Sequence, residues 1–356
     1  MRTFVWLAAT LLILAAASIE PPRFEDPRLE SAIRAELGIE TGPLNRSSLS
    51  KITHITASGL EIFSLSGLEN CRHLQYLDAS KNHITSLAPL ANLVSLQTLI
   101  LNSNQITDVD PLSQLTGLMR LDLDFNFVTD ISALANLPDL RWLGLWNSHI
   151  ADISPLTHLT NLEELGLSGS PIQDTTPLEG LTKLRWLGLP NTGIERIDFL
   201  HGKKKLIKLS LGGNAIADLT PLSELTQLEG LGLDNNDIAN VRPLANLTSL
   251  KRLSLWGNHI EDISSLAGLT QLEQLWLDRN PISDISILSG FRELHILGLS
   301  RLPVDSLDAL LDNPGLGEGD ELDVRAIKAV LDANPETLAQ IQEMINRGIH
   351  VMWDNP

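Results

Sequence analysis

The sequence is poor in cysteine, aromatic residues and positive charge, and each shortage excludes a class of protein. One cysteine in 356 residues, Cys71, leaves no internal disulfide framework and no thiolate-bound metal cluster. Lys and Arg total 26 against 44 Asp and Glu, a formal charge of −18, so the surface repels phosphate backbones and we expect no nucleic-acid partner. Aromatic residues make up only 4%, so the positions of the few large rings become informative.

The amino terminus carries a long apolar run. Residues 1–18, MRTFVWLAATLLILAAAS, place one positive charge before this run and small residues after it, which is typical of a secretory signal peptide. The run from Phe4 to Ala17 has 14 residues, short of the ~20 needed to span a bilayer. We therefore expect a secreted protein, periplasmic or extracellular, without a membrane span once the signal is removed.

From Ile52 onward the sequence repeats every 22 residues through twelve copies. Each copy follows the template L-x-x-L-x-L-x-x-N-x-I-x-x-I-x-x-L-x-x-L. Its first part alternates like a short strand, and its second part has apolar residues every third position, like 3₁₀ turns. One unit is too thin to bury its own leucines, so stacked units must create the core. The pattern predicts an α/β solenoid: a right-handed superhelix with one parallel sheet on its concave face and 3₁₀ turns and loops on its convex side.

Both ends of the repeat have segments suited to cover an exposed core. Upstream, Asp26 is placed to cap a helix that begins at Pro27 and stops at Gly38. Downstream, a helix is predicted over 335–347, capped by Asn334, and a last edge strand over 349–353. We expect one cooperative unit with a signal peptide (1–18), an N-terminal helical cap (19–51), the solenoid (52–311) and a C-terminal cap (312–356).

The template is similar to the 22-residue leucine-rich repeats of bacterial internalin-like proteins, over residues from about 52 to 310. Segment 24–53 resembles the helical cap that opens many such proteins, and 312–325 resembles the loop-and-strand ending of bacterial members. The resemblance implies a recognition module. No LPxTG sequence follows the C-terminal cap, so covalent wall anchoring is not implied.

The ninth position of the unit is an asparagine in most copies. A buried amide there can donate to and accept from the neighbouring backbone, so we predict a structural role for Asn82, Asn104, Asn126, Asn214, Asn236, Asn258 and Asn280. Three central copies have Ser148, Ser170 and Thr192 instead, and these shorter side chains predict a local change in stacking.

The third, fifth and seventh positions point away from the core, because the fourth and sixth point into it. All Trp fall on these outward positions except Trp6 and Trp353. Parallel strands lie ~4.8 Å apart, so residues at one position of successive units are neighbours. They predict two partner-binding patches. The first contains Arg120, Asp122, Asp124, Trp142, Trp146, Glu164, Trp186 and Lys208, and the second Arg252, Trp256, Trp276 and Asp278.

Three consecutive units have a glycine at the fifth position, next to the tryptophans of the first patch. These glycines are Gly144, Gly166 and Gly188. Two interpretations are open. The rings could simply cover the glycines, or the glycines could form a shallow floor that lets a partner approach the backbone. Large amphipathic rings bordered by charged residues match binding hot spots, which favours a binding surface.

Catalysis has little support. Asp122 and Asp124 lie on one face of one strand and admit a glycosidase hypothesis. An open sheet, however, offers no burial to raise one pKa, as general acid catalysis requires. His83, His149 and His259 share one position but lie ~14 and ~24 Å apart, too far for one metal site. We predict no enzyme, no metal and no cofactor.

Three functions remain. The favoured hypothesis is an exported, monomeric recognition or adhesion module that binds a protein through the concave sheet. A carbohydrate-binding surface is the alternative, because tryptophans also stack on sugar rings. A phosphatase-regulating scaffold is the third, because eukaryotic regulators with 22-residue repeats resemble this unit as well.

Overall fold

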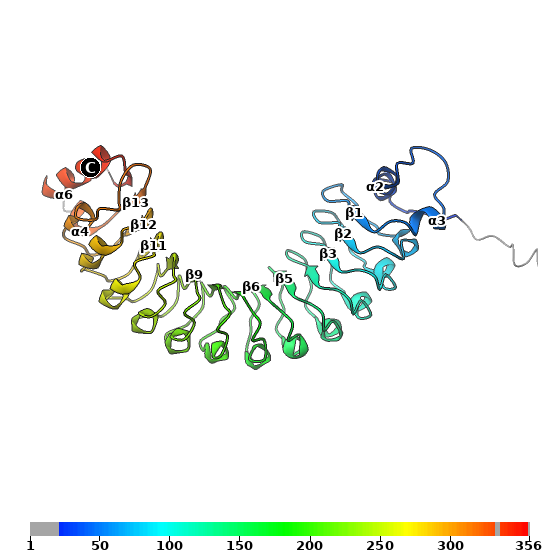
Figure 1. The fold of residues 1–356 in the computed structure, drawn as a ribbon, viewed down its shortest axis with the longest axis horizontal. Coiled ribbons are helices and arrows are strands. Elements are labelled where there is room, and N and C mark those ends of the chain that lie inside the picture. Colours follow the sequence, from blue (N-terminus) through cyan, green and yellow to red (C-terminus); the bar gives the residue numbers. More distant parts are fainter. Residues whose placement is uncertain (1–20, 332–334, 355–356) are drawn as a thin grey trace, which may run out of the picture.

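The computed structural model describes residues 21–331 and 335–354, and the predicted signal peptide lies outside them. The described chain forms an arc whose inner side carries a parallel sheet and whose outer side carries 3₁₀ turns (Figure 1). The 14 strands of the sheet follow one another in sequence order, from β1 to β14. The predicted α/β solenoid is confirmed.

The strands recur with the period of the sequence and pair without a shift in register. Leu77 pairs with Leu99, and Leu99 with Leu121. The repeat strands are β1 (His54–Thr56), β2 (Tyr76–Asp78), β3 (Thr98–Ile100), β4 (Arg120–Asp122), β5 (Trp142–Trp146), β6 (Glu164–Ser168), β7 (Trp186–Gly188), β8 (Lys208–Ser210), β9 (Gly230–Gly232), β10 (Arg252–Ser254), β11 (Gln274–Trp276) and β12 (Ile296–Gly298).

Each of the strands β1 to β11 is followed by a 3₁₀ turn on the outer side of the arc (Figure 1). These turns are η1 (Leu68–Asn70), η2 (Ala88–Leu90), η3 (Asp110–Leu112), η4 (Ser132–Asn136), η5 (Ser154–His158), η6 (Thr176–Leu178), η7 (Asp198–Leu200), η8 (Thr220–Leu222), η9 (Arg242–Leu244), η10 (Ser264–Gly268) and η11 (Ser286–Gly290). Many are preceded by an exposed aspartate, such as Asp130, whose Oδ1 accepts a hydrogen bond of 2.8 Å from the Ser132 N–H. This bond lowers the pKa of the Asp130 carboxyl.

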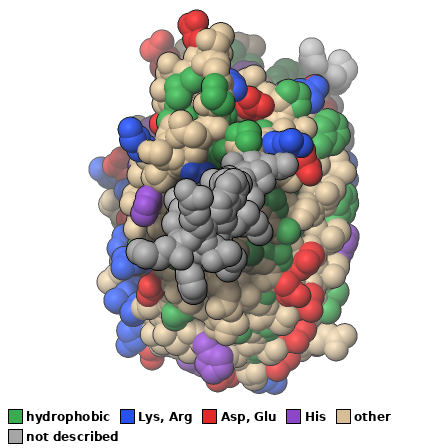
Figure 2. Space-filling model, turned by 90° about the vertical axis from the view of Figure 1, so that its right-hand side faces the viewer, with side chains coloured by type: hydrophobic (Ala, Val, Ile, Leu, Met, Phe, Trp, Pro, Cys, Tyr) green, Lys and Arg blue, Asp and Glu red, His purple; other side chains and the backbone are tan. Residues whose placement is uncertain are grey.

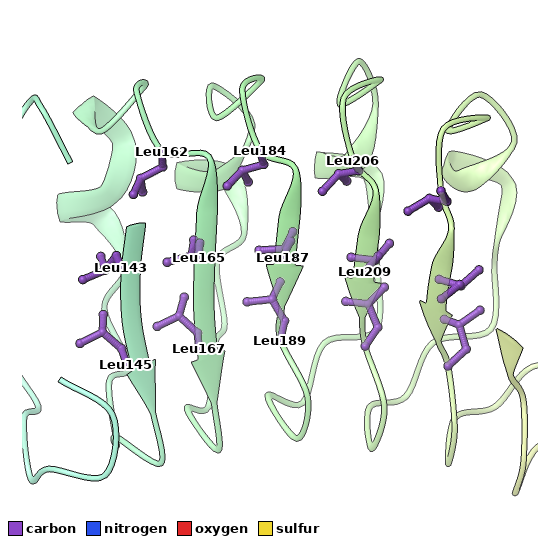
Figure 3. Packing of buried hydrophobic residues seen from close by; sticks show 14 of the residues in the cluster. Leu143, Leu145, Leu162, Leu165, Leu167, Leu184, Leu187, Leu189, Leu206 and Leu209 are labelled. Atoms are coloured by element: carbon purple, nitrogen blue, oxygen red, sulfur yellow. The ribbon is translucent and has the colours of Figure 1, made fainter. Parts of the chain in front are cut away.

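The core is built from rows of leucines behind the strands. Leu143, Leu165 and Leu187 come from adjacent strands, point to the same side and are fully buried (Figure 3). Burying each such side chain stabilises the fold by roughly 1.5–3 kcal/mol. Because every unit contributes the same rows, the core extends along the arc and no unit has a core of its own.

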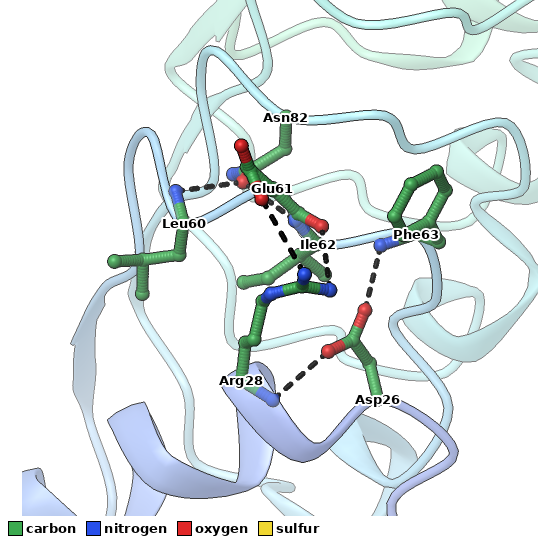
Figure 4. A network of polar contacts seen from close by, with 7 residues as sticks. All are labelled: Asp26, Arg28, Leu60, Glu61, Ile62, Phe63 and Asn82. Atoms are coloured by element: carbon green, nitrogen blue, oxygen red, sulfur yellow. Dashed lines mark hydrogen bonds and ion pairs between the residues drawn. The ribbon is translucent and has the colours of Figure 1, made fainter.

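The N-terminal cap is attached to the first unit by polar contacts. Helix α2 (Pro27–Leu37) begins after Asp26 and ends at Gly38, whose φ is +64°, and α3 (Arg46–Leu49) follows it. The Asp26 carboxylate accepts from the Arg28 N–H at 2.9 Å and from the Phe63 N–H at 2.7 Å (Figure 4). One carboxylate therefore both caps the helix and joins it to the solenoid.

The C-terminal cap continues the sheet by two more strands. After β12 the last unit returns through α4 (Asp308–Leu311), and the cap contains β13 (Glu321–Asp323), α5 (Lys328–Leu331), α6 (Pro335–Asn346) and β14 (His350–Met352). The predicted helix ends one residue before Arg347, and the predicted last strand lies at the edge, parallel to β13. The predicted capping residue Asn334 lies outside the described residues.

A lysine replaces leucine at one core position. Lys203 is completely buried, and its Nζ donates to the carbonyl oxygens of Leu178 at 2.7 Å and Glu179 at 3.0 Å. Burial lowers the pKa of the Lys203 ammonium to about 8. The neighbouring unit therefore supplies the oxygen atoms that a buried ammonium requires.

Charge is distributed unevenly around the arc. Viewed from the N-terminal end, Asp and Glu side chains gather along one lower side of the molecule and Lys and Arg along the other (Figure 2). At this end of the molecule the two signs of charge are therefore partly segregated (Figure 2).

Candidate functional site

The outward positions of the strands lie on the concave face, as the alternation requires. Trp142, Trp146 and Trp186 are half-buried, and so are Trp256 and Trp276. The first patch lies on adjacent strands from β4 to β8. The second lies on β10, β11 and the residues that follow them. Strand β9, whose outward residues are Gly230 and Gly232, separates the two patches.

The glycines of the first patch lie beneath the Trp rings. A Cβ on Gly144 would lie 2.6 Å from Cη2 of Trp142, and one on Gly188 would lie 3.0 Å from Cη2 of Trp186. A Cβ on Gly166 would overlap Nε1 of Trp146. All three glycines are buried. The interpretation as an open floor for a partner's backbone is therefore wrong, because the rings already occupy that space.

The rings are arranged as a flat platform. Trp146 and Trp186 are stacked, with ring centroids 6.2 Å apart and planes inclined by 15°. The Arg120 guanidinium carbon lies 3.9 Å from the ring centroid of Trp142. Aromatic stacking contributes about 0.5–1.5 kcal/mol beyond area burial, and cation–π contact about 0.5–2 kcal/mol. These contacts hold the rings in place, so a partner would meet a preorganised surface.

The carboxylates beside the platform are more buried than an open sheet suggests. Burial raises the pKa of Asp124 to about 6, with a smaller contribution from the negative charge of Asp122. The pKa of Asp122 is also raised, mainly by burial. The expectation that the sheet cannot raise a carboxyl pKa is therefore wrong, because the flanking side chains remove water from the two carboxylates.

This pair still does not resemble an acid and a base. Asp124 Oδ1 accepts from the Trp146 N–H at 2.7 Å, and Asp122 Oδ1 accepts from the Asp124 N–H at 3.2 Å. Each carboxylate thus already accepts a backbone hydrogen bond from the strand ends of the platform. Within residues 21–331 and 335–354, neither carboxylate forms an ion pair. The positive charge of Arg120 acts on both and partly offsets the rise in their pKa values.

The other predicted residues lie at the borders of the patches. Glu164 and Lys208 are exposed on β6 and β8, on either side of Trp186 in the sheet. In the second patch Arg252 is exposed, and Asp278 Oδ1 accepts from the Ser300 N–H at 2.9 Å. Asp278 therefore bonds the backbone of the next unit as Asp124 bonds the Trp146 N–H in the first patch.

The asparagines lie behind the turns that follow the strands. Asn236 is representative. Its Nδ2 donates to the carbonyl oxygens of Leu211 and Leu233, both at 3.0 Å, and its Oδ1 accepts from the Ile216 N–H at 3.0 Å. Corresponding bonds are made by Asn82, Asn104, Asn126, Asn214, Asn258 and Asn280. They join consecutive units through the backbone.

The units without this asparagine differ locally. The strands β5 and β6, which precede Ser148 and Ser170, have five residues, and Trp146 pairs with Ser168. Ser170 Oγ donates to the Ser148 carbonyl at 2.8 Å, whereas Ser148 Oγ is a buried atom without a partner in the described chain. The longer strands lie directly under the Trp platform, so the change in the asparagine column coincides with the first patch.

The chain has close structural relatives. The family model of leucine-rich repeats in two copies matches residues 94–136, 138–180 and 226–268. A crystal structure of an internalin (inlF) from Listeria monocytogenes is 32% identical, with a TM-score of 0.75, over 84% of this chain and 97% of the internalin. The chain belongs to the internalin-like leucine-rich-repeat proteins.

Two further solved structures share the fold. The functional domain of Listeria monocytogenes InlJ is 24% identical, with a TM-score of 0.74, over 87% of this chain and 68% of that one. A leucine-rich-repeat protein of Leptospira interrogans is 20% identical, with a TM-score of 0.67, over 83% and 82%. No curated protein matches the chain. InlJ includes a cysteine ladder, whereas this internalin-like chain has only Cys71, which is buried and whose pKa burial raises to about 12.

The fold of this internalin-like protein indicates a protein-interaction module, of a type that typically lacks enzymatic activity. In the described part of the chain, no helix is both long and apolar enough to cross a membrane. Among the same residues, no group of three or more His, Cys, Asp and Glu side chains could hold a metal ion.

Two sets of surface residues were missed by the sequence patterns. Phe125 and Phe127 are 54% and 61% exposed at the rim of the concave face, and the Phe125 N–H donates to the Trp146 carbonyl at 2.7 Å. Arg279, Arg301 and Arg325 line one pocket near the C-terminal cap. These residues follow the outward strand positions, so reading the eighth and tenth columns of the repeat would have found Phe125, Phe127, Arg279 and Arg301.

Proposed function

We propose that this internalin-like protein is an exported, non-enzymatic recognition module that binds a protein partner through the concave face. The supporting observation is the platform of Trp142, Trp146 and Trp186, which is held flat yet remains half-exposed. Aromatic rings in a rigid arrangement are typical of binding hot spots, and truncating such a residue costs about 2 kcal/mol or more in binding.

The first patch also suggests the chemistry of the partner. Asp122 and Asp124 are partly desolvated carboxylates, and Phe125 and Phe127 extend the apolar surface onto the rim. A partner that places a basic side chain over the carboxylates and an apolar segment against the rings would complement both features. Such a partner would bind more weakly where Asp124 is protonated.

In this proposal residues 1–18 direct export, residues 52–311 carry the binding face, and residues 19–51 and 312–356 cover its ends. The mature chain acts as a monomer. Secretion of a reporter fused to residues 1–25 tests export, and sedimentation of the mature chain tests its oligomeric state. A reporter that stays inside the cell would favour an intracellular scaffold, such as a phosphatase regulator.

The binding face is tested by affinity capture of extracellular proteins with matched variants. Glu164→Lys reverses a charge between Trp142 and Trp186 without changing a buried side chain. Glu261→Lys makes the same change at an exposed turn residue outside both patches. We expect one protein to be retained by the wild type and by Glu261→Lys and to be lost with Glu164→Lys.

The triple variant Trp142→Ala/Trp146→Ala/Trp186→Ala tests the rings themselves. Its far-UV circular dichroism spectrum should match that of the wild type, because the leucine rows behind the strands are unchanged. Retention of the captured protein by this folded variant would contradict the proposal. A glycan array probed in parallel distinguishes the carbohydrate alternative, in which the same variant loses a sugar and no protein is captured.

A further inference from the structure

A pocket near the C-terminal cap gathers three arginines in a chain that is strongly acidic overall. Arg279, Ser300, Arg301, Arg325, Ala326 and Asp354 line a cavity of about 280 Å³. The sheet register explains the gathering. Arg279 and Arg301 each follow their strands, β11 and β12, by three residues, and Arg325 follows β13 by two. Consecutive units of the sheet thus bring three arginines together beyond the carboxyl ends of their strands.

The backbone that follows these strands forms a row of hydrogen bonds, and the last of them is accepted by a carboxylate. The Arg279 N–H donates to the Ser300 carbonyl, and the Arg301 N–H to the Arg325 carbonyl, both at 2.9 Å. At the equivalent next step, the Ala326 N–H donates to Asp354 Oδ2 at 2.6 Å. An oxyanion of the chain itself therefore already lies in the pocket.

The three guanidinium groups are not equally engaged. Arg325 forms two bonds with the Asp323 carboxylate, from Nε at 2.9 Å and from Nη2 at 2.6 Å. Arg279 lies 5.8 Å from the ring centroid of Trp256, and Arg301 is exposed. Across the described residues, neither Arg279 nor Arg301 forms an ion pair with a carboxylate. Two guanidinium groups are thus available to a ligand.

The nearby carboxylates already accept hydrogen bonds, and of these Asp354 does so inside the pocket. Asp323 is held by Arg325, Asp278 accepts from the Ser300 N–H, and Asp354 accepts from the Ala326 N–H. Like charges on neighbouring strands repel each other. A planar guanidinium offers two parallel N–H groups that match the oxygens of phosphate and sulfate. A tetrahedral oxyanion in the pocket would therefore find matching donors on Arg279 and Arg301.

We propose that this pocket binds the phosphate or sulfate group of an anionic ligand. Arg279 and Arg301 form the ion pairs, Ser300 supplies a hydroxyl donor, and Arg325 is held in position by Asp323. Asp354 acts as an internal competitor, since its carboxylate occupies one side of the same pocket. The site adjoins the second patch, through Arg279 at Trp256 and Ser300 at Asp278, but is separate from the Trp142–Trp186 platform of the proposed protein-binding site.

Isothermal titration calorimetry of the full chain at low ionic strength tests the proposal. The probes are inorganic phosphate, sulfate and glucose 6-phosphate. We expect saturable binding of one anion per chain that weakens as sodium chloride is added, because screening acts on exposed charges. Binding of phosphate and sulfate without glucose 6-phosphate would assign the site to the free ion, binding of glucose 6-phosphate alone would assign it to an ester, and binding of all three would show that the site takes the group in either form.

Matched variants make the result specific to the pocket. Arg279→Gln and Arg301→Gln remove charge from exposed side chains and should each weaken binding about tenfold, whereas Asp354→Asn should strengthen it about threefold. Arg196→Gln is the control. Arg196 is exposed, forms an ion pair with Asp198 and is not a residue of this pocket, so this variant should bind the anion as the wild type does. No saturable binding, or equal binding by wild type and Arg301→Gln, would overturn the proposal. Glu164→Lys should bind phosphate as the wild type does, because Glu164 is not a residue of this pocket. A failure of the chain to bind phosphate would therefore not contradict the proposal that the concave face binds a protein.

Discussion

The asparagines of neighbouring units should be energetically coupled, because they share acceptors. The carbonyl oxygen of Leu233 accepts from Asn236 Nδ2 and from Asn258 Nδ2, both at 3.0 Å. The carbonyl oxygen of Leu211 is shared in the same way by Asn214 and Asn236. Removing one asparagine therefore leaves each shared carbonyl with one donor.

For Asn236→Ala, the main loss is the acceptor of a buried N–H. Ile216 N–H donates to Asn236 Oδ1, and an orphaned buried donor costs about 1–3 kcal/mol. Weakening of the shared carbonyl bonds adds about 1 kcal/mol. We expect the free energy of unfolding to fall by about 2–4 kcal/mol in total.

The double variant Asn236→Ala/Asn258→Ala should lose more than the two single variants together. It leaves the Leu233 carbonyl without either amide donor, which adds a coupling of about 1–3 kcal/mol. The pair Asn236→Ala/Asn280→Ala is the control, because Asn280 donates to the carbonyls of Leu255 and Leu277 and shares no acceptor with Asn236. Its effects should add.

Urea unfolding, followed by both circular dichroism and Trp fluorescence, measures these values, provided that the two transitions coincide. Equal coupling free energies for the neighbouring pair, Asn236 and Asn258, and for the control pair, Asn236 and Asn280, would refute coupling through the shared carbonyl. In that case the carbonyl would have found water or a new donor, and the asparagine column would stabilise each unit independently.

Three further predictions concern single positions. Because the folded pKa of Asp124 is raised from 3.8 to about 6, the unfolding free energy should fall as the pH rises through this window, and Asp124→Asn should remove that component of a urea titration series. Gly166→Ala should displace Trp146 and cost about 0.5–1.5 kcal/mol of stacking, visible as a change in near-UV circular dichroism with the far-UV spectrum unchanged. The folded pKa of Lys203 is lowered from 10.5 to about 8, so the free energy of unfolding of the wild type should rise with pH between 8 and 10.5 relative to that of Lys203→Met. Equal dependence of the two unfolding free energies on pH in this range would contradict this prediction.

The periodicity of the sequence was sufficient to predict the solenoid, because each unit is copied with the same spacing. Leu99 and Leu121 are 22 residues apart, and they pair in the sheet. The same spacing placed Trp142 and Trp186 on the concave face, since alternation along a strand settles which side a residue faces. The caps were predictable for a local reason: Asp26, Pro27 and Gly38 are a helix start and stop within a few residues.

How side chains lie on that face could not be derived from spacing. Glycines at the fifth position of three successive units are equally compatible with covering rings and with an open floor. Only the contact of Trp146 with Gly166 decided between these two interpretations. The burial of Asp124 likewise depends on its neighbours in other strands. Such contacts involve rotamers and side chains of different units, which the repeat template leaves free.

The sequence by itself determined the repeat, the strand register and the concave position of the tryptophans, because these follow from short-range patterns repeated along the chain. The tertiary structure decided which surfaces are accessible and which charges are compensated. The Arg279–Arg301–Arg325 pocket is an example, because Arg325 and Asp354 come from the non-repeating cap and reach the last units only once the sheet is assembled.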